Sequence, residues 1–253
     1  MAGKFRSPAY FCYQALWAAL DWLYPPHCAG CGLPGQRWCG ACQENTIKLA
    51  GCVCEQCGEP CATSGKCMLC RQAPPAFAAV RSWAAYTGPV RQALHSLKYR
   101  RNIALGDSLS IHLIDLYNQL KWGVDCVVPV PLSRSRNKAR GYNQSALLAQ
   151  PLSLAINIPY KPGFLQRVRE TASQVGLNEN ERLQNVRGAF SAQPKHIAGK
   201  SILVIDDITT TGATLQQCAK ALITAGARCV YGLTVARAVL HSHNDYGRDY
   251  PNP

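Results

Sequence analysis

From residue 76 onward, short apolar runs alternate with longer segments in which apolar residues recur every three or four positions. The short runs predict buried strands, and the longer segments predict helices. Strands are expected at residues 78–86, 126–130, 201–205 and 229–235. Helices are expected at residues 90–98, 105–120, 144–155 and 213–225. Strands that alternate with helices favour an α/β fold, with a mostly parallel sheet and helices on both faces.

The first 75 residues follow other patterns. Within residues 1–24, four large apolar residues stand at helical spacing: Leu16, Trp17, Leu20 and Leu23. They predict a short amphipathic helix that packs on the rest of the protein, with contact to a membrane surface as the alternative. Polar residues interrupt the apolar run, so no transmembrane segment is expected. The expected organisation is a leading helix (1–24), a cysteine-rich module (25–75), a main domain (76–240) and a polar tail (241–253).

The net charge of the chain indicates which classes of partner it favours. The 253 residues include 27 Lys and Arg against 14 Asp and Glu, which gives a net charge of +13. Such an excess favours polyanionic partners: nucleic acid, phosphate-rich ligands or an anionic membrane surface. The hydrophobic content of 47% is enough for a sizeable core, so a disordered chain is excluded.

Ten of the fourteen cysteines lie between Cys28 and Cys70. Eight of them form four C-x-x-C pairs: Cys28 and Cys31, Cys39 and Cys42, Cys54 and Cys57, Cys67 and Cys70. Two such pairs complete a tetrahedron of thiolates around Zn²⁺. The spacing therefore predicts structural zinc rather than disulfides, in a reducing compartment such as the cytoplasm. The spacing allows two arrangements: either consecutive pairs share an ion, or alternate pairs interleave. Cys52, Cys61 and His27 are alternative ligands.

The strand expected at 201–205 leads into two acids and then a loop rich in hydroxyls. The acids are Asp206 and Asp207, and the loop runs into the next helix through Thr209, Thr210, Thr211, Gly212, Ala213 and Thr214. Backbone N–H groups at a helix start attract phosphate, the hydroxyls add donors, and glycine permits a positive φ or a close approach. The two acids suit a ligand that also presents ribose hydroxyls, bound directly or through Mg²⁺.

This segment resembles the phosphoribosyl-pyrophosphate (PRPP) site of type I phosphoribosyltransferases. The resemblance implies that the acids bind the ribose 2′ and 3′ hydroxyls and that the loop cradles the 5′-phosphate. The competing interpretation is a strand followed by a helix whose Asp and Thr residues are only caps.

A basic loop follows the strand expected at 126–130, and it contains Pro131, Leu132, Ser133, Arg134, Arg136 and Arg140. The same resemblance implies that this loop binds pyrophosphate; the alternatives are a solvated loop or a nucleic-acid patch. Residues 164–190 are polar, and here the resemblance implies a flexible lid that brings Arg167, Gln174 and Arg182 to the pyrophosphate. An ordinary surface loop is the competing interpretation.

Further motifs accompany the cysteine pairs and the phosphate loop: Pro74-Pro75, Leu97-Lys98-Tyr99, Pro129-Val-Pro-Leu132, Arg140-Gly-Tyr-Asn-Gln144, Gln174-x2-Leu177, Arg182-x2-Asn185 and Ala189-Phe190. Together these motifs make nearly the whole chain resemble the competence protein F (ComF/GntX) family. The resemblance implies a phosphoribosyltransferase-like protein that acts in the uptake or utilisation of DNA, together with other DNA-uptake proteins.

Two functions follow from these observations. The first is an enzyme that transfers the phosphoribosyl group of PRPP, with Mg²⁺, to an acceptor; no catalytic base is evident in the sequence. The second is a non-catalytic adaptor for single-stranded DNA that uses the same fold as a scaffold. In the adaptor, basic loops and zinc knuckles hold the strand, and aromatic residues stack on its bases; the competing interpretation is that these aromatic residues fill the core or turns. The candidates for stacking are Trp38, Tyr86, Tyr99 and Tyr142.

Overall fold

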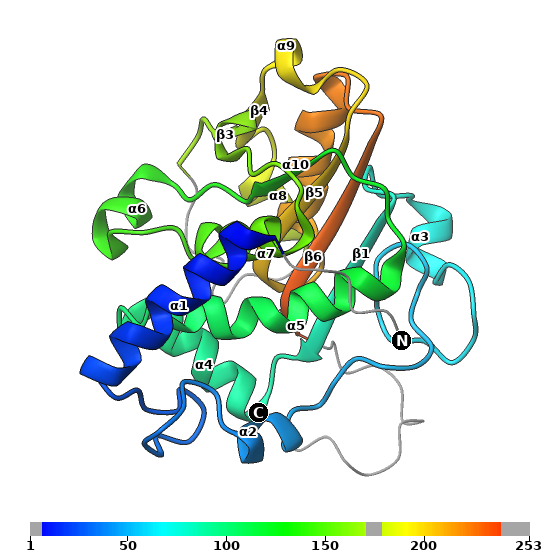
Figure 1. Cartoon of the computed structure of the whole chain (residues 1–253). Coiled ribbons are helices and arrows are strands. Elements are labelled where there is room, and N and C mark those ends of the chain that lie inside the picture. The colour runs from blue at the N-terminus through cyan, green and yellow to red at the C-terminus, as the bar shows by residue number, and fades with distance from the viewer. Residues whose placement is uncertain (1–6, 171–178, 239–253) are drawn as a thin grey trace.

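A computed structural model describes residues 7–170 and 179–238 of the chain. Four parallel strands form its main sheet, in the order β1-β6-β5-β2 (Figure 1). They are β1 (Ala79–Ala85), β2 (Cys126–Pro129), β5 (Ser201–Thr209) and β6 (Cys229–Arg237). The parallel sheet and its strand positions are as the sequence predicts. Strand β5 is longer than expected, because Asp206, Ile208 and Thr209 still pair with β6.

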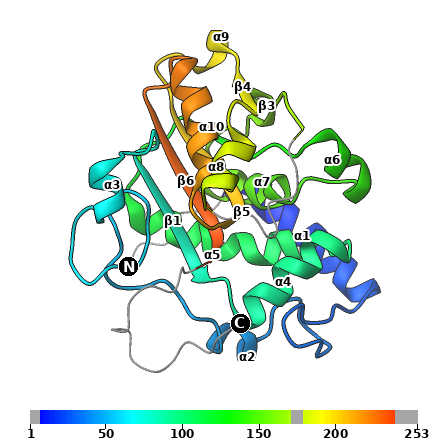
Figure 2. The ribbon, with the colours of Figure 1, turned by 180° about the vertical axis from the view of Figure 1, so that it is seen from behind.

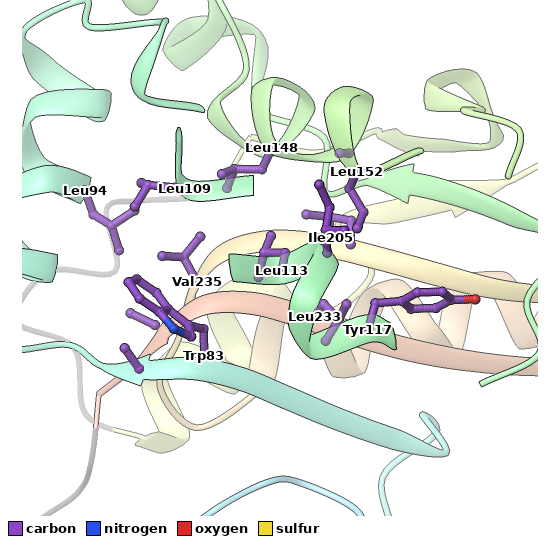
Figure 3. Close-up of a cluster of buried hydrophobic side chains, with 14 of the residues drawn as sticks. Trp83, Leu94, Leu109, Leu113, Tyr117, Leu148, Leu152, Ile205, Leu233 and Val235 are labelled. Carbon is purple, nitrogen blue, oxygen red and sulfur yellow. The ribbon is translucent and has the colours of Figure 1, made fainter. Parts of the chain in front are cut away.

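Three helices cover one face of the sheet: α4 (Gly88–Tyr99), α5 (Leu105–Leu120) and α7 (Gln144–Ile156). Figure 3 shows leucines of these helices meeting strand residues such as Ile205, Leu233 and Val235 in a buried cluster. Trp83 of β1 stacks on His112 of α5 with ring centroids 3.8 Å apart. Burial lowers the pKa of His112 to about 4, so its imidazole is neutral at neutral pH.

The opposite face is covered by α10 (Ala213–Thr224), as Figure 2 shows from behind. Ile202 and Val204 of β5 point to this side, since side chains alternate along a strand. Helix α8 (Glu179–Val186) and an antiparallel ribbon of β3 (Leu165–Arg167) and β4 (Phe190–Ala192) pack beside α10. The remaining short helices of the main domain are α6 (Arg134–Arg140), η1 (Pro162–Phe164) and α9 (Pro194–Ile197). Helices on both faces confirm the predicted fold class.

Helix α1 (Pro8–Leu23) forms as predicted, but it packs through a different face. Of the four apolar residues, Trp17 is half-buried, with the guanidinium of Arg37 4.7 Å from the centre of its ring. Leu16 and Leu23 are each 61% exposed, so these two do not pack as expected. The helix is fixed instead by Tyr10, which is 1% exposed, and by Gln14, whose Nε2 donates to Asp107 Oδ1 of α5 at 2.6 Å. Apolar spacing alone does not reveal such a polar anchor. Within the described ranges, no helix has both the length and the apolar content needed to cross a bilayer.

Close packing between α5 and α7 depends on Gly106, where a Cβ atom would lie 2.7 Å from Leu147 Cβ. We expect Gly106→Ala to lower the free energy of unfolding by about 1–3 kcal/mol, although alanine favours a helix over glycine by about 1 kcal/mol. Urea unfolding measures this change. Gly123→Ala is the control, because its Cβ would meet nothing within 4 Å. A stability equal to or above that of the wild type for Gly106→Ala would contradict the close contact.

Candidate functional site

The two acids of the sequence motif lie at the end of β5, where Asp206 is 8% and Asp207 is 4% exposed. Asp206 Oδ1 accepts hydrogen bonds from Ser145 Oγ and from the backbone N–H of Asp207, both at 2.9 Å. Burial, followed by the charge of Asp207, raises the pKa of Asp206 to about 8. Asp206 is therefore mostly protonated at neutral pH.

Lys98 of α4 supplies the cation for the second acid, with its Nζ 2.5 Å from Asp207 Oδ2. Burial acts to lower the pKa of Lys98, but Asp207 outweighs burial and the pKa is raised. The lysine is therefore charged, and the ion pair lies mostly away from water. A buried pair of this kind is costly to break, because removing one partner leaves an uncompensated charge.

The loop after β5 has the geometry of an anion site. Gly212 begins α10 with a φ of +79°, a conformation that other residues adopt only with strain. The buried Oγ1 atoms of Thr209 and Thr211 have no hydrogen-bond partner in the described part of the chain. Ala213 is buried, and Thr210 and Thr214 are half-buried. Unpaired hydroxyls beside the N-terminus of a helix are suited to donate hydrogen bonds to a phosphate group.

The motif Arg140-Gly-Tyr-Asn-Gln144 connects this site to its surroundings. Tyr142 donates its hydroxyl to Leu97 O, next to Lys98. Asn143 caps α7 by accepting from Ser145 N at 3.0 Å, and it donates to Val130 O at 2.9 Å. The motif therefore holds together α4, the end of β2 and the start of α7, where Ser145 reaches Asp206.

The predicted pyrophosphate loop follows β2 and runs into α6. Pro131 and Leu132 are half-buried, and Ser133 caps the helix by accepting from Arg136 N at 3.4 Å. Arg134 is exposed, and Arg140 donates to Gln144 Oε1 at 3.0 Å. Whether this loop binds pyrophosphate stays a prediction.

A carboxylate already contacts this loop. Glu170 accepts from Ser135 N at 3.2 Å and from Ser135 Oγ at 2.8 Å. These hydrogen bonds lower the pKa of Glu170, the side chain of Ser135 contributing most. The start of α6 is therefore able to hold an acidic group.

One of the three predicted lid residues can be placed fully. Arg167 of β3 stands over the ring of Phe190 at 5.3 Å, and burial, followed by the charge of Arg136, lowers its pKa. Arg182 lies in α8, but its side chain is outside the described part, as is all of Gln174. The lid itself stays a prediction.

The eight cysteines of the C-x-x-C pairs gather in two clusters. The first contains Cys28, Cys31, Cys39 and Cys42, and the second contains Cys54, Cys57, Cys67 and Cys70; within each, all Sγ atoms lie within 4.8 Å of one another. Consecutive pairs therefore come together, which decides between the two arrangements that the spacing allowed. The Sγ atoms of Cys52 and Cys61 lie 3.9 Å apart outside both clusters, and His27 is not part of either.

The two clusters fit zinc. A tetrahedral site with Zn–S bonds of about 2.3 Å has sulfur atoms about 3.8 Å apart, and Cys57 Sγ and Cys67 Sγ are separated by 3.8 Å. The fourth ligand of each cluster lies on a short helix, α2 (Gly40–Glu44) or α3 (Met68–Gln72). Burial opposes ionisation of Cys54, but N–H groups led by that of Cys67 outweigh it and lower the pKa to about 6. This thiolate is ready to bind a cation.

Comparison with known proteins agrees with this description. A family model described as a double zinc ribbon domain matches residues 19–72, and one described as a phosphoribosyl transferase domain matches residues 138–249. The DNA utilization protein YhgH of Escherichia coli (strain K12) is 33% identical over 198 residues, which cover 76% of this chain and 86% of that protein. Competence protein F of Haemophilus influenzae is 28% identical over 222 residues, covering 84% and 96%. The chain belongs to the competence protein F family.

Solved structures resemble this chain less closely than these relatives do. Adenine phosphoribosyltransferase from Leishmania donovani is 13% identical with a TM-score of 0.37, covering 63% of this chain and 76% of that one. A glutamine PRPP amidotransferase from B. subtilis is 23% identical with a TM-score of 0.36, covering 51% and 26%. Scores at this level add nothing to the match of the family models.

Three residues that contact the candidate site were not foreseen from the sequence. Lys98 stands in the last turn of α4, where a lysine is usually a solvated cation beside the helix end. Its only signal is its place within the family motif Leu97-Lys98-Tyr99. Ser145 and Arg237 carry no local signal, because each acts through contacts with residues far away in the sequence.

We expect Asp206→Asn to stabilise the protein, because the amide keeps an acceptor for Ser145 while removing a buried charge. The pKa of Asp206 is about 8 in the folded protein, above the ordinary value of 3.8. Between these two pH values the unfolded chain ionises more readily than the folded protein, so the free energy of unfolding falls as the pH rises. Below both values the acid is protonated in both states and has no such effect. The free energy of unfolding should rise by on the order of 1–3 kcal/mol at pH 8.5, and by less at pH 5. Urea unfolding at both pH values measures the difference. A pH-independent change, or a loss at pH 8.5, would show that Asp206 is not a buried acid of raised pKa.

Proposed function

We propose that this member of the competence protein F family binds PRPP with Mg²⁺ and acts in the uptake or utilisation of DNA. The observation that carries the proposal is the buried pair of Asp206 and Asp207 directly before a loop whose Thr209 and Thr211 hydroxyls find no hydrogen-bond partner among the described residues. Carboxylates suit ribose hydroxyls or Mg²⁺, and the loop suits a phosphate. One site therefore offers groups for both ends of a phosphoribosyl ligand.

In the proposed binding mode, the two loops contact different parts of PRPP. The acids hold the ribose, directly or through Mg²⁺, while Thr209 to Thr214 surround the 5′-phosphate. Arg134, Arg136 and Arg140 of the loop after β2 neutralise the pyrophosphate, and Arg167 approaches from β3. When bound, Mg²⁺ supplies further neutralisation of the pyrophosphate charge. These positions follow from the family resemblance and are supported by the arrangement of the side chains.

A transfer reaction would use the same arrangement. The bond between the ribose C1 and the pyrophosphate oxygen breaks, an acceptor nucleophile bonds to C1, and the pyrophosphate leaves with the bonding electrons. Stabilising the departing charge is the task of the arginines and backbone amides. The thiolates needed for zinc also support a reducing location, for which we propose the cytoplasm.

Isothermal titration of PRPP and Mg²⁺ into the zinc-loaded protein tests the binding. We expect the double variant Asp206→Asn/Asp207→Asn to weaken binding by at least ~10-fold, since a hydrogen bond to a charged group contributes about 1.5–3 kcal/mol. Asp115→Asn, at an exposed position of α5, should bind like the wild type. A folded wild type that shows no binding would rule out the PRPP site. Binding, if observed, opens the search for an acceptor by pyrophosphate release.

A second function, attachment of single-stranded DNA, is favoured by one specific observation. Tyr99 is 61% exposed at the end of α4, with the guanidinium of Arg140 5.1 Å from its ring and the ring of His95 4.8 Å away. Arg100 and Arg101 follow it in the chain. An exposed ring among cations is the arrangement on which a base stacks while the backbone is held electrostatically.

The other three aromatic candidates are engaged elsewhere. Trp38 packs on Trp83 and donates to Gln43, Tyr142 is bonded to Leu97 O, and Tyr86 packs against the core. Of the four, Tyr99 is therefore the one that suits stacking.

Fluorescence anisotropy with a labelled oligothymidylate tests this surface. We expect Tyr99→Ala to weaken binding by roughly 5- to 100-fold, since stacking on one base contributes about 1–3 kcal/mol. Tyr24→Ala, which removes a 77% exposed tyrosine at the end of α1, is the matched control. Equal affinities for the two variants would refute the Tyr99 platform.

A further inference from the structure

Arg237, the last residue of β6, is a buried cation that contacts two separate parts of the chain. Its side chain is 3% exposed. The Nη1 atom donates to Thr210 O of the phosphate loop at 3.2 Å and to Glu59 Oε2 at 2.6 Å. The Nη2 atom donates to Cys57 O. Arg237 therefore joins the phosphate loop (residues 209–214) to the second zinc ribbon, which is the part that contains the cluster of Cys54, Cys57, Cys67 and Cys70.

The contacts on the ribbon side come from the turn that holds its first two ligands. Cys57 and Glu59 flank Gly58, whose N–H donates to Cys54 O at 3.0 Å and whose φ is +74°. A Cβ atom at Gly58 would lie 2.4 Å from Val80 O, so this turn rests directly on β1. Because the same turn places two thiolates around one ion, its shape depends on bound metal.

A second connection runs beside the first. Gln56, within the same turn, donates from Nε2 to Phe77 O at 3.1 Å and to Pro75 O at 3.2 Å. The ring of Phe77 lies 3.9 Å from where a Cβ of Gly212 would stand, which places it against the phosphate loop. The loop is therefore bordered on two sides by residues that the second ribbon holds in place.

The first ribbon packs elsewhere. Its Gly30 lies against Pro89 at the start of α4, where an added Cβ would be 3.0 Å from Pro89 Cβ. Its Trp38 meets Trp83, with ring centroids 6.2 Å apart. The contacts of its four cysteines stay within the ribbon, and its Arg37 pairs with Asp21 of α1. The two metal sites thus differ in what they support.

From this difference we infer that Arg237 is a positioning residue through which metal in the second ribbon, but not in the first, holds the phosphate loop in its binding shape. The inference rests on the proposed phosphate site for its consequence in binding, while the coupling between ribbon and loop is independent of it. By thermodynamic linkage, a ligand in the loop must in turn strengthen zinc retention by the second ribbon.

The fourth ligand of each ribbon gives a matched pair of variants, since Cys42 and Cys70 are each 4% exposed and each lie on a short helix. Either Cys42→Ser or Cys70→Ser should leave one zinc ion per chain instead of the two that the clusters can hold. In hydrogen–deuterium exchange, we expect faster exchange of residues 208–216 in Cys70→Ser and unchanged exchange in Cys42→Ser. Residues 105–120 of α5 are the internal reference for general loosening.

Two further variants keep all zinc ligands. Arg237→Lys retains the charge but cannot reach three acceptors, and Glu59→Gln removes the carboxylate that pairs with Arg237. Both should keep two zinc ions per chain, judged by release to a chromophoric chelator. Both should still speed exchange of residues 208–216 and weaken PRPP binding, by ~10-fold for Arg237→Lys. Zinc release from the second ribbon is the phase that is missing in Cys70→Ser. In the wild type, PRPP should slow this phase.

The outcomes separate this inference from the proposed function. If the wild type fails to bind PRPP but the loop still loosens in Cys70→Ser and Arg237→Lys, the coupling holds and the proposed ligand is wrong. If the wild type binds PRPP and the loop behaves alike in Cys42→Ser and Cys70→Ser, the coupling is refuted. The coupling is equally refuted if Arg237→Lys keeps wild-type loop exchange and affinity.

Discussion

Two acids lie side by side and nearly buried at the end of β5, where burial and mutual repulsion both oppose the ionisation of the pair. The fold supplies what offsets the repulsion: Lys98 from α4 pairs with Asp207, and Ser145 from α7 donates to Asp206. Both helices belong to the layer that covers the face of the sheet containing Ile205 and Val235. The apolar packing of that layer is thus what brings the partners of the acids to the site, and a loosened core would loosen the site as well.

The parts of this arrangement that depend on neighbouring residues were predictable from the sequence. Strand, acid pair, hydroxyl loop and helix follow one another without interruption, so β5 and α10 could be placed from pattern alone. Lys98 and Arg237 could not, because an isolated cation in a helix or strand gives no sign of which distant group it meets. Their roles appear only when α4 and β6 have been placed beside β5.

Two other features show the same limit in different ways. The equal spacing of the cysteine pairs allowed either pairing, and the decision comes from how each turn packs on its neighbours. For α1, the apolar residues suggested one buried face, but the contacts of Gln14 and Tyr10 select another. In both cases the local pattern identifies the element correctly, and tertiary contacts determine its orientation or its partners.

All four main strands are parallel, so β5 and β6 end at the same edge of the sheet. Ala238 N donates to Thr209 O there, at 2.9 Å, beside the phosphate loop. At the opposite end of the described chain, Ser7 contacts Leu154, near the end of α7 far from Ser145. A label attached at Ala238 would therefore report on the phosphate loop, whereas a label attached at Ser7 would report on a place a helix length away from it.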